Sequence, residues 1–199
     1  MKAKILIILI LSVVLSSCDD GKVIRCDLTE AQKQIIPSYE KGKISFIDGA
    51  GQTVYLTIEN HLYWHSISKN HDEYYYKLKA VTLKSRPDDL VIGLNLIADG
   101  GLSEDKYKVS SGYVNSSFLV NINTYAHSTR IASFGLTVDT EGNFLINSSM
   151  AFHDSLEING KVYFDVVEKN EGSMQLFYSK TYGILQFRKE GANFLTLKD

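Results

Sequence analysis

The sequence has only two prolines, no excess of basic residues and no apolar stretch long enough to be an ordinary membrane span. Pro37 and Pro87 leave long stretches in which every backbone amide can join a hydrogen-bond ladder. A formal net charge of −2 lacks the basic surface that nucleic-acid phosphates require, so we expect no nucleic-acid partner. The longest apolar run, residues 5–15, would extend roughly 16 Å as a helix, against roughly 30 Å of bilayer hydrocarbon.

The beginning of the chain has instead the pattern of a secretory leader. Lys2 and Lys4 form a basic start, the apolar run follows, and small residues end it. Such a segment is removed from the mature protein. We therefore interpret residues 1–17 as a signal peptide.

The segment that ends this leader, Leu15-Ser16-Ser17-Cys18, resembles the lipobox of bacterial lipoproteins. In that family the signal peptidase cleaves just before the cysteine, and the cysteine thiol carries a diacylglycerol. The resemblance implies that Leu15, Ser16 and Ser17 are the recognition positions and that Cys18 is the acylated first residue. The alternative is an ordinary signal peptide followed by an incidental cysteine.

Cleavage before Cys18 would leave 182 residues with a net charge of −4, because two lysines leave with the leader. Several acyl chains hold a protein stably on a membrane, since each buried CH₂ contributes about 0.8 kcal/mol. Acylation would also leave Cys26 without a partner for a disulfide, a redox pair or a cysteine-based zinc site.

The resemblance implies a location in the cell envelope, on the outer membrane and facing the periplasm or the cell surface. Asp19 and Asp20 resemble the surface-export signal of lipoproteins of Bacteroidota. In other Gram-negative bacteria an aspartate at that place can retain a lipoprotein in the inner membrane. A third alternative is a simple solvated tether.

The mature chain has the composition of one ordinary globular domain. It is 44% hydrophobic and 22% charged, and no linker rich in proline, glycine or serine divides it. We expect a tether over residues 18–28 and a single all-β domain over residues 29–199. Thr29 and Gln32 have the spacing of a capping box, which predicts one short helix at residues 30–35.

Beyond this helix the pattern is strand and turn. Residues 44–58 alternate around a glycine-rich turn at 49–51, and Asn159-Gly160 is the strongest two-residue hairpin signal in the chain. The alternation in residues 73–85 shifts phase near Ala80, which predicts a β-bulge.

Residues 90–97 and 144–152 are further expected strands, and residues 100–112 read as a loop or a weak edge strand. Twelve tyrosines and nine phenylalanines favour strands too, because a pleated surface accommodates aromatic side chains well. The expected fold is all-β: a single antiparallel β-sandwich or open barrel with one short N-terminal helix.

The C-terminal part is similar to the closing module of many uncharacterised outer-membrane lipoproteins of Bacteroidota. Their pattern is roughly Gly-x-x-Tyr-x-Asp/Asn-Val followed by Tyr-Tyr-Ala/Ser-Lys-x-x-Gly-Ile/Leu. The matching positions here are Gly160, Tyr163, Asp165, Val166, Tyr178, Ser179, Lys180, Gly183 and Ile184, with Phe177 at the first aromatic of the second block. Residues 35–56 resemble the opening of such proteins. The resemblance implies no established activity and no catalytic residue.

No sequence pattern indicates catalysis or a bound metal. His61 and His65 share one face of a strand, with His71 in the next turn, but this spacing is not a recognised zinc pattern. Ser179 and Lys180 are neighbours in an expected strand and point to opposite faces. No serine lies in a Gly-x-Ser-x-Gly elbow, and there is no nucleotide fingerprint. We therefore expect no catalytic residue, no metal and no cofactor.

The aromatic residues near the middle of the chain are the candidate ligand-binding residues. Tyr63, Trp64 and Tyr75 cluster across one suspected hairpin, and rings with a polar tip suit both sugar stacking and protein interfaces. The alternative is that these rings belong to the core and to cross-strand pairs. Ser155, in Asp-Ser-Leu, resembles the O-glycosylation pattern of Bacteroidota.

These patterns predict a lipid-anchored, non-enzymatic binding module for a glycan, an apolar ligand or another envelope protein. One alternative is a structural component of an outer-membrane complex that docks through a sheet edge or an aromatic patch. A hydrolase with a site assembled from distant loops is the third hypothesis.

Overall fold

The computed structural model describes residues 23–39, 42–69, 72–85, 90–98, 112–113, 115–124 and 129–198. The elements in these ranges are β1 (Val23–Asp27), α2 (Glu30–Lys33), β2 (Lys43–Asp48), β3 (Thr53–Lys69), β4 (Asp72–Ser85), β5 (Val91–Ile97), β6 (Gly112–Tyr113), β7 (Ser116–Thr124), β8 (Thr129–Val138), β9 (Met150–Ile158), β10 (Lys161–Glu171), β11 (Met174–Ser179), β12 (Gly183–Lys189) and β13 (Ala192–Leu197). The lipobox positions Leu15, Ser16, Ser17 and Cys18 lie outside these ranges.

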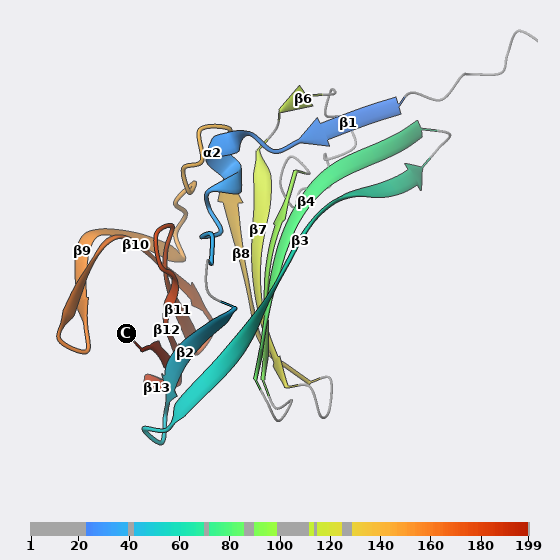
Figure 1. The fold of residues 1–199 in the computed structure, drawn as a ribbon. Helices are drawn as coiled ribbons and strands as arrows, with labels where there is room; N and C mark the ends of the chain where they lie inside the picture. Colours follow the sequence, from blue (N-terminus) through green and yellow to red (C-terminus); the bar gives the residue numbers. More distant parts are fainter. Residues whose placement is uncertain are drawn as a thin grey trace, which may run out of the picture.

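Among the described residues, eleven strands form one sheet in the order β8-β7-β5-β4-β3-β2-β13-β12-β11-β10-β9. Every neighbouring pair in this path is antiparallel. The sheet curls into an open half-barrel, with α2 near one end (Figure 1). The all-β antiparallel fold predicted from the sequence is therefore confirmed.

Strand β1 is the exception to the antiparallel pattern, and it corrects the expected tether. It pairs in parallel with β4 and with β6, and the β4 register runs from Val23 beside Glu73 to Cys26 beside Tyr76. Cys26 and Leu28 are each only 1% exposed. Residues 23–28, predicted as part of the tether over 18–28, thus belong to the folded structure. Strand β1 can pair with β4 at residues 73–76 because β5 pairs with β4 only over residues 78–84.

The short helix forms where the capping box predicts it. The Thr29 hydroxyl accepts from the Gln32 amide at 3.0 Å, and the Gln32 side chain accepts from the Thr29 amide at 2.9 Å. The helix spans Glu30–Lys33, two residues shorter than the expected 30–35. No helix within the described ranges has the length and apolar character needed to cross a bilayer.

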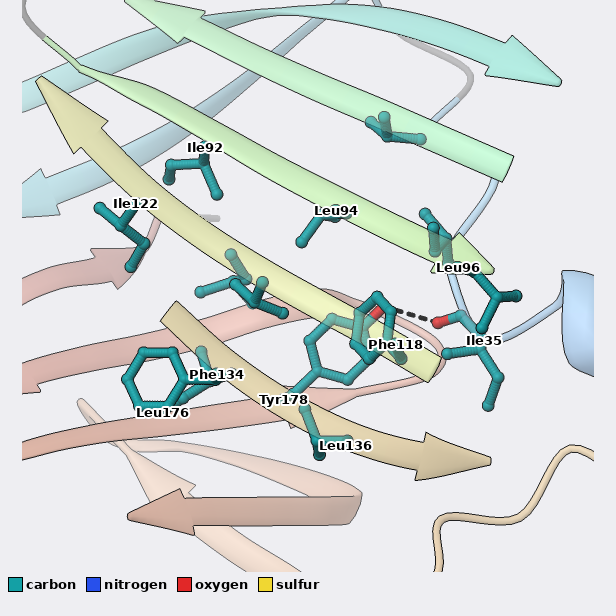
Figure 2. Packing of buried hydrophobic residues seen from close by; sticks show 14 of the residues in the cluster. Ile35, Ile92, Leu94, Leu96, Phe118, Ile122, Phe134, Leu136, Leu176 and Tyr178 are labelled. Atoms are coloured by element: carbon teal, nitrogen blue, oxygen red, sulfur yellow. Dashed lines mark hydrogen bonds between the residues drawn. The ribbon is translucent and has the colours of Figure 1, made fainter. Parts of the chain in front are cut away.

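The main core lies inside the curl, where strands from distant parts of the path meet (Figure 2). The rings of Phe118 on β7 and Tyr178 on β11 have centroids 4.9 Å apart. Phe134 on β8 and Phe187 on β12 meet edge to face at 5.8 Å. The in-phase apolar residues of the strand expected at 90–97 all point into this core: Leu90, Ile92, Leu94 and Leu96.

A second, smaller core forms because the β9–β10 hairpin bends. Its buried members come from β9, β10, β11 and β12: Ile158, Tyr163, Val166, Phe177 and Leu185. Asp165 has a left-handed backbone with φ of 53°, which interrupts the alternation, so that Tyr163 and Val166 are both buried and Phe164 is exposed. Asn159 and Gly160 form the predicted tight turn, with φ of 52° and 80°.

Two local predictions are wrong. The pairing of β3 with β4 runs without a register shift, so no bulge lies near Ala80. Ala80 and Val81 are both buried, on opposite faces of β4, and this explains the apparent change of phase. The strand expected at 144–152 begins only at Met150, because the preceding residues form turns and a single bridge at Phe144. The loop expected at 100–112 lies almost wholly outside the described residues.

Candidate functional site

The candidate site surrounds the segment that follows α2, residues 35–39, which we call the strap. Three hydrogen bonds hold the end of the helix and the strap in place. The Lys79 ammonium group donates to the carbonyl oxygens of Lys33 at 2.6 Å and Ile36 at 2.8 Å. The Tyr178 hydroxyl donates to the carbonyl oxygen of Ile35 at 2.5 Å (Figure 2). Pro37 adds its own rigidity, so the walls that the strap forms are fixed before any ligand arrives.

Lys79 is half-buried, and this burial lowers the pKa of its ammonium group. The carbonyl groups at the C-terminal end of a helix carry partial negative charge, which compensates a nearby cation. Lys79 therefore links β4 to α2 across the concave side of the sheet.

One pocket, of about 410 Å³, lies between the strap and the middle of β3 and β4; we call it the arm pocket. Its walls combine apolar and polar side chains, as ligand pockets usually do. The lining residues are Lys33, Pro37, Ser38, Tyr39, Asn60, His61, Leu62, Lys79 and Ala80.

A second pocket, of about 350 Å³, lies on the side of the strap that faces the β11–β12 turn; we call it the turn pocket. It shares Lys33, Pro37, Ser38 and Lys79 with the arm pocket. Its lining residues are Glu30, Lys33, Gln34, Ile36, Pro37, Ser38, Lys79, Lys180 and Thr181. Among these described residues, three lysines from three elements outnumber the one carboxylate of Glu30, so this lining is positively charged and rich in hydrogen-bond donors.

The three lysines have different neighbours. The Lys33 ammonium group lies 2.7 Å from the Glu30 carboxylate. Lys79 is bound to the helix carbonyls. The Lys180 ammonium group lies 5.9 Å above the ring of Phe144, in a cation–π arrangement. An anion in the turn pocket would meet more positive than negative charge.

The residues that carry the resemblance to lipoproteins have structural roles around this site. Tyr178 holds the strap through its hydroxyl group. Gly183 has φ of 79°, and a side-chain carbon there would overlap the hydroxyl of Tyr39. Burial raises the pKa of both tyrosine hydroxyls. Lys180 differs from these residues because its side chain lines a pocket.

Two of the three predicted ligand-binding residues, Tyr63 and Trp64, follow Leu62 of the arm pocket on β3 but do not line that pocket. Tyr63 is 48% exposed and Trp64 is 43% exposed, so neither ring belongs to the core. They are consecutive residues of a regular strand and point to opposite faces. Trp64 pairs with Lys77, whose ammonium group lies 4.8 Å above the indole ring. The backbone of Tyr75 pairs with Ser66, and its side chain lies outside the description.

Tyr63 and Trp64 belong to a projecting part of the sheet that we call the arm, residues 59–69 of β3 and 72–77 of β4 (Figure 1). Strand β2 pairs with β3 only over residues 53–57, and a further backbone bond joins Ile58 to Gly42. Within the described ranges no strand pairs with the outer edge of β3 beyond this point. Leu62, 54% exposed, completes a run of three exposed apolar side chains.

Polar side chains on β9, β10 and β11 form a network in which they hydrogen-bond to one another. The Glu168 carboxylate accepts from His153 at 2.9 Å, from Asn170 at 2.9 Å and from Gln175 at 2.7 Å. Burial alone would raise the pKa of Glu168, but these hydrogen bonds outweigh it and hold the pKa below its ordinary value. Since the Glu168 carboxylate already accepts three hydrogen bonds, we interpret this network as a structural link between neighbouring strands.

The predicted glycosylation residue and the histidines considered as metal ligands can be placed as follows. Ser155 is exposed on β9, where its hydroxyl group is accessible. In the described part of the chain no three histidine, cysteine, aspartate or glutamate side chains are grouped as a metal site would need. His61 is exposed on β3 and lines the arm pocket, whereas His71 and the side chain of His65 lie outside the description.

Comparison of the chain with protein-family models, with curated proteins and with solved structures gives no significant match.

The turn pocket was missed by the sequence analysis because its lysines are far apart in the chain. Lys33, Lys79 and Lys180 come from α2, β4 and the β11–β12 turn. The only available signal was Lys180, which the lipoprotein pattern contains, but a lysine in a turn is usually just a solvated residue.

Proposed function

We propose that this protein is a lipid-anchored component of the cell envelope that binds an anionic glycan without converting it. The observation that carries the proposal is the turn pocket, where Lys33, Lys79 and Lys180 line a preformed and donor-rich cavity. Charge-assisted hydrogen bonds from lysine favour carboxylate and phosphate groups. The adjoining arm pocket offers Pro37 and Tyr39 together with polar groups, a mixture that suits a sugar ring.

Three further observations support a binding role. The strap is fixed by Lys79 and Tyr178, so little ordering has to accompany binding. Among the described residues only Glu30 contributes a carboxylate to the two pockets, whereas glycoside hydrolysis usually depends on two. Lipid anchoring is supported by the lipobox-like segment before Cys18.

The proposal predicts that binding depends on charge in the turn pocket. Full-length protein in detergent is applied to an array of neutral, uronic-acid and phosphorylated oligosaccharides. We expect acidic sugars to bind in preference to neutral ones, and Lys180→Gln to weaken binding about five- to tenfold, as loss of one charge-assisted contact does. The bound sugar should be recovered unchanged.

The matched control is Lys189→Gln, which removes the same charge from an exposed position at the end of β12. It should bind acidic sugars like the unaltered protein. Equal weakening by the two substitutions, or equal binding of neutral and acidic sugars, would contradict the proposal.

A second candidate function is that of an assembly component, and the unpaired edge of β3 favours it. An exposed strand edge can accept a strand from another protein. A photo-crosslinking amino acid in place of Leu62 in native membranes would then capture one stoichiometric envelope protein, whereas the same amino acid in place of Tyr55 would not. If the amino acid at position 62 captures no protein and the protein binds acidic sugars, the assembly function is contradicted and the glycan-binding function is supported.

A further inference from the structure

The first described strand starts beside the tip of the arm. Val23 of β1 pairs with Glu73, the second residue of β4. Because β1 runs parallel to β4, its first residue, Val23, lies near the distal end of the arm (Figure 1). Cys18 lies five residues before Val23, and five residues span at most about 17 Å when fully extended.

This short connection limits how far the exposed residues of the arm can lie from an anchored membrane. Trp64 pairs with Lys77, four residues along β4 from Glu73, which corresponds to about 14 Å. With two steps of about 4.8 Å between strands added, Trp64 therefore lies within about 40 Å of Cys18. Tyr55 lies nine residues before Trp64 on β3, which places it about 30 Å further from the tip of the arm.

We propose that the arm rests on the bilayer to which Cys18 is anchored, with Leu62, Tyr63 and Trp64 in the headgroup layer. The inference rests on the lipid anchoring that is part of the proposed function, and it adds a second contact between protein and membrane. The anchor then sets the orientation of the domain as well as its location.

The chemistry of the exposed run fits a headgroup layer. Tryptophan and tyrosine favour the membrane–water interface, where an apolar ring and a polar group are both satisfied. The Lys77 ammonium group above the Trp64 ring supplies positive charge for lipid phosphates.

The backbone groups at the outer edge of β3 limit how deeply the arm can enter the membrane. The outer edge of β3 carries amide and carbonyl groups that have no strand partner within the described ranges. Such groups are costly in hydrocarbon but are satisfied by water and headgroups. Leu62 and Trp64 lie on one face of β3 and Tyr63 on the other, so edge-on contact brings all three to the same layer.

The sequence contains one tryptophan, which makes the test direct. Full-length acylated protein is reconstituted into phosphatidylcholine–phosphatidylglycerol vesicles with or without lipids brominated near the headgroup end of the acyl chains. We expect bromine to reduce Trp64 emission at least about twofold, as it does for rings at the interface. Unchanged emission from protein that sediments with the vesicles would overturn the inference.

The control moves the tryptophan to the other end of the same strand. In a Trp64→Phe, Tyr55→Trp double variant, the indole replaces a tyrosine that is 61% exposed and far from the anchor. Bromine should leave its emission unchanged, and equal quenching at both positions would also overturn the inference.

Cosedimentation separates this inference from the anchoring on which it rests. If Cys18→Ser does not reduce sedimentation with vesicles, the anchoring itself fails. If Cys18→Ser abolishes sedimentation while Trp64 in the acylated protein is not quenched, the anchor stands and only the arm contact is wrong.

Discussion

Tyr39 of the strap and Tyr178 of β11 each bury a hydroxyl group, with different consequences. The Tyr178 hydroxyl donates to the Ile35 carbonyl, whereas the buried Tyr39 hydroxyl has no hydrogen-bond partner among the described residues. Removing one member of a buried hydrogen bond leaves its partner unsatisfied, but removing an unpartnered hydroxyl relieves a desolvation cost. The space left by glycine at position 183 is what lets the Tyr39 ring lie there.

We therefore predict opposite effects of two identical changes. Tyr178→Phe should lower the free energy of unfolding by about 1–3 kcal/mol, because the Ile35 carbonyl loses its donor. Tyr39→Phe should leave stability unchanged or raise it. Urea unfolding followed by circular dichroism measures both. Equal losses in the two variants would show that the strap is not held by the Tyr178 hydrogen bond.

At the scale of elements, the bent β9–β10 hairpin shows how one residue redirects a strand. Asp165 adopts a left-handed backbone in the middle of β10, and Tyr163 before it and Val166 after it are both buried in the second core. Aspartate tolerates this conformation better than most residues, because its short polar side chain bonds locally, while β-branched residues do not.

This predicts that the shape of the residue at 165 matters more than its charge. Asp165→Val should cost about 1–2 kcal/mol of unfolding free energy, whereas Asp165→Asn and Asp165→Gly should cost close to nothing. Asp154→Val, at an exposed position of β9 with an ordinary backbone, is the matched control and should change stability by less than about 0.5 kcal/mol. If both valine variants behave alike in urea unfolding, the bend does not depend on the left-handed residue.

At the scale of the whole molecule, the curl of the sheet is maintained by contacts between its two halves. Phe118 and Phe134 come from one end of the strand path and meet Tyr178 and Phe187 from the other half. These ring contacts lie apart from the hydrogen-bond ladders that join neighbouring strands, so burial of apolar surface is what favours them.

Deleting a ring at this junction should therefore affect the entire domain. Phe118→Ala should lower the free energy of unfolding by about 3–5 kcal/mol, through lost burial and the cavity left behind. Phe164→Ala removes the same atoms from a side chain that is 62% exposed and should change stability by less than about 0.5 kcal/mol. Thermal unfolding and urea titration measure the difference, and comparable losses in both variants would contradict a main core shared by the two halves of the sheet.

Local patterns predicted much of the fold because they depend on neighbours in the chain. Thr29 and Gln32 indicated the helix start, Asn159-Gly160 the tight turn, and the alternation from Leu90 the inward face of β5. The phase shift at Ala80 misled us, since a small side chain can be buried on either face of a strand. The pairing of β1 with β4 was not predicted, because the sequence of residues 23–27 carries no information about which strand it pairs with.

By itself the sequence determined the class of fold, the capped helix and the tight turns. These features follow from backbone geometry and side-chain alternation, both of which can be read along the chain. Only the tertiary structure decided how far the sheet curls, that β1 starts at the tip of the arm, and that three distant lysines line one pocket. Such placements depend on which apolar faces pack together, and that is a property of the complete chain.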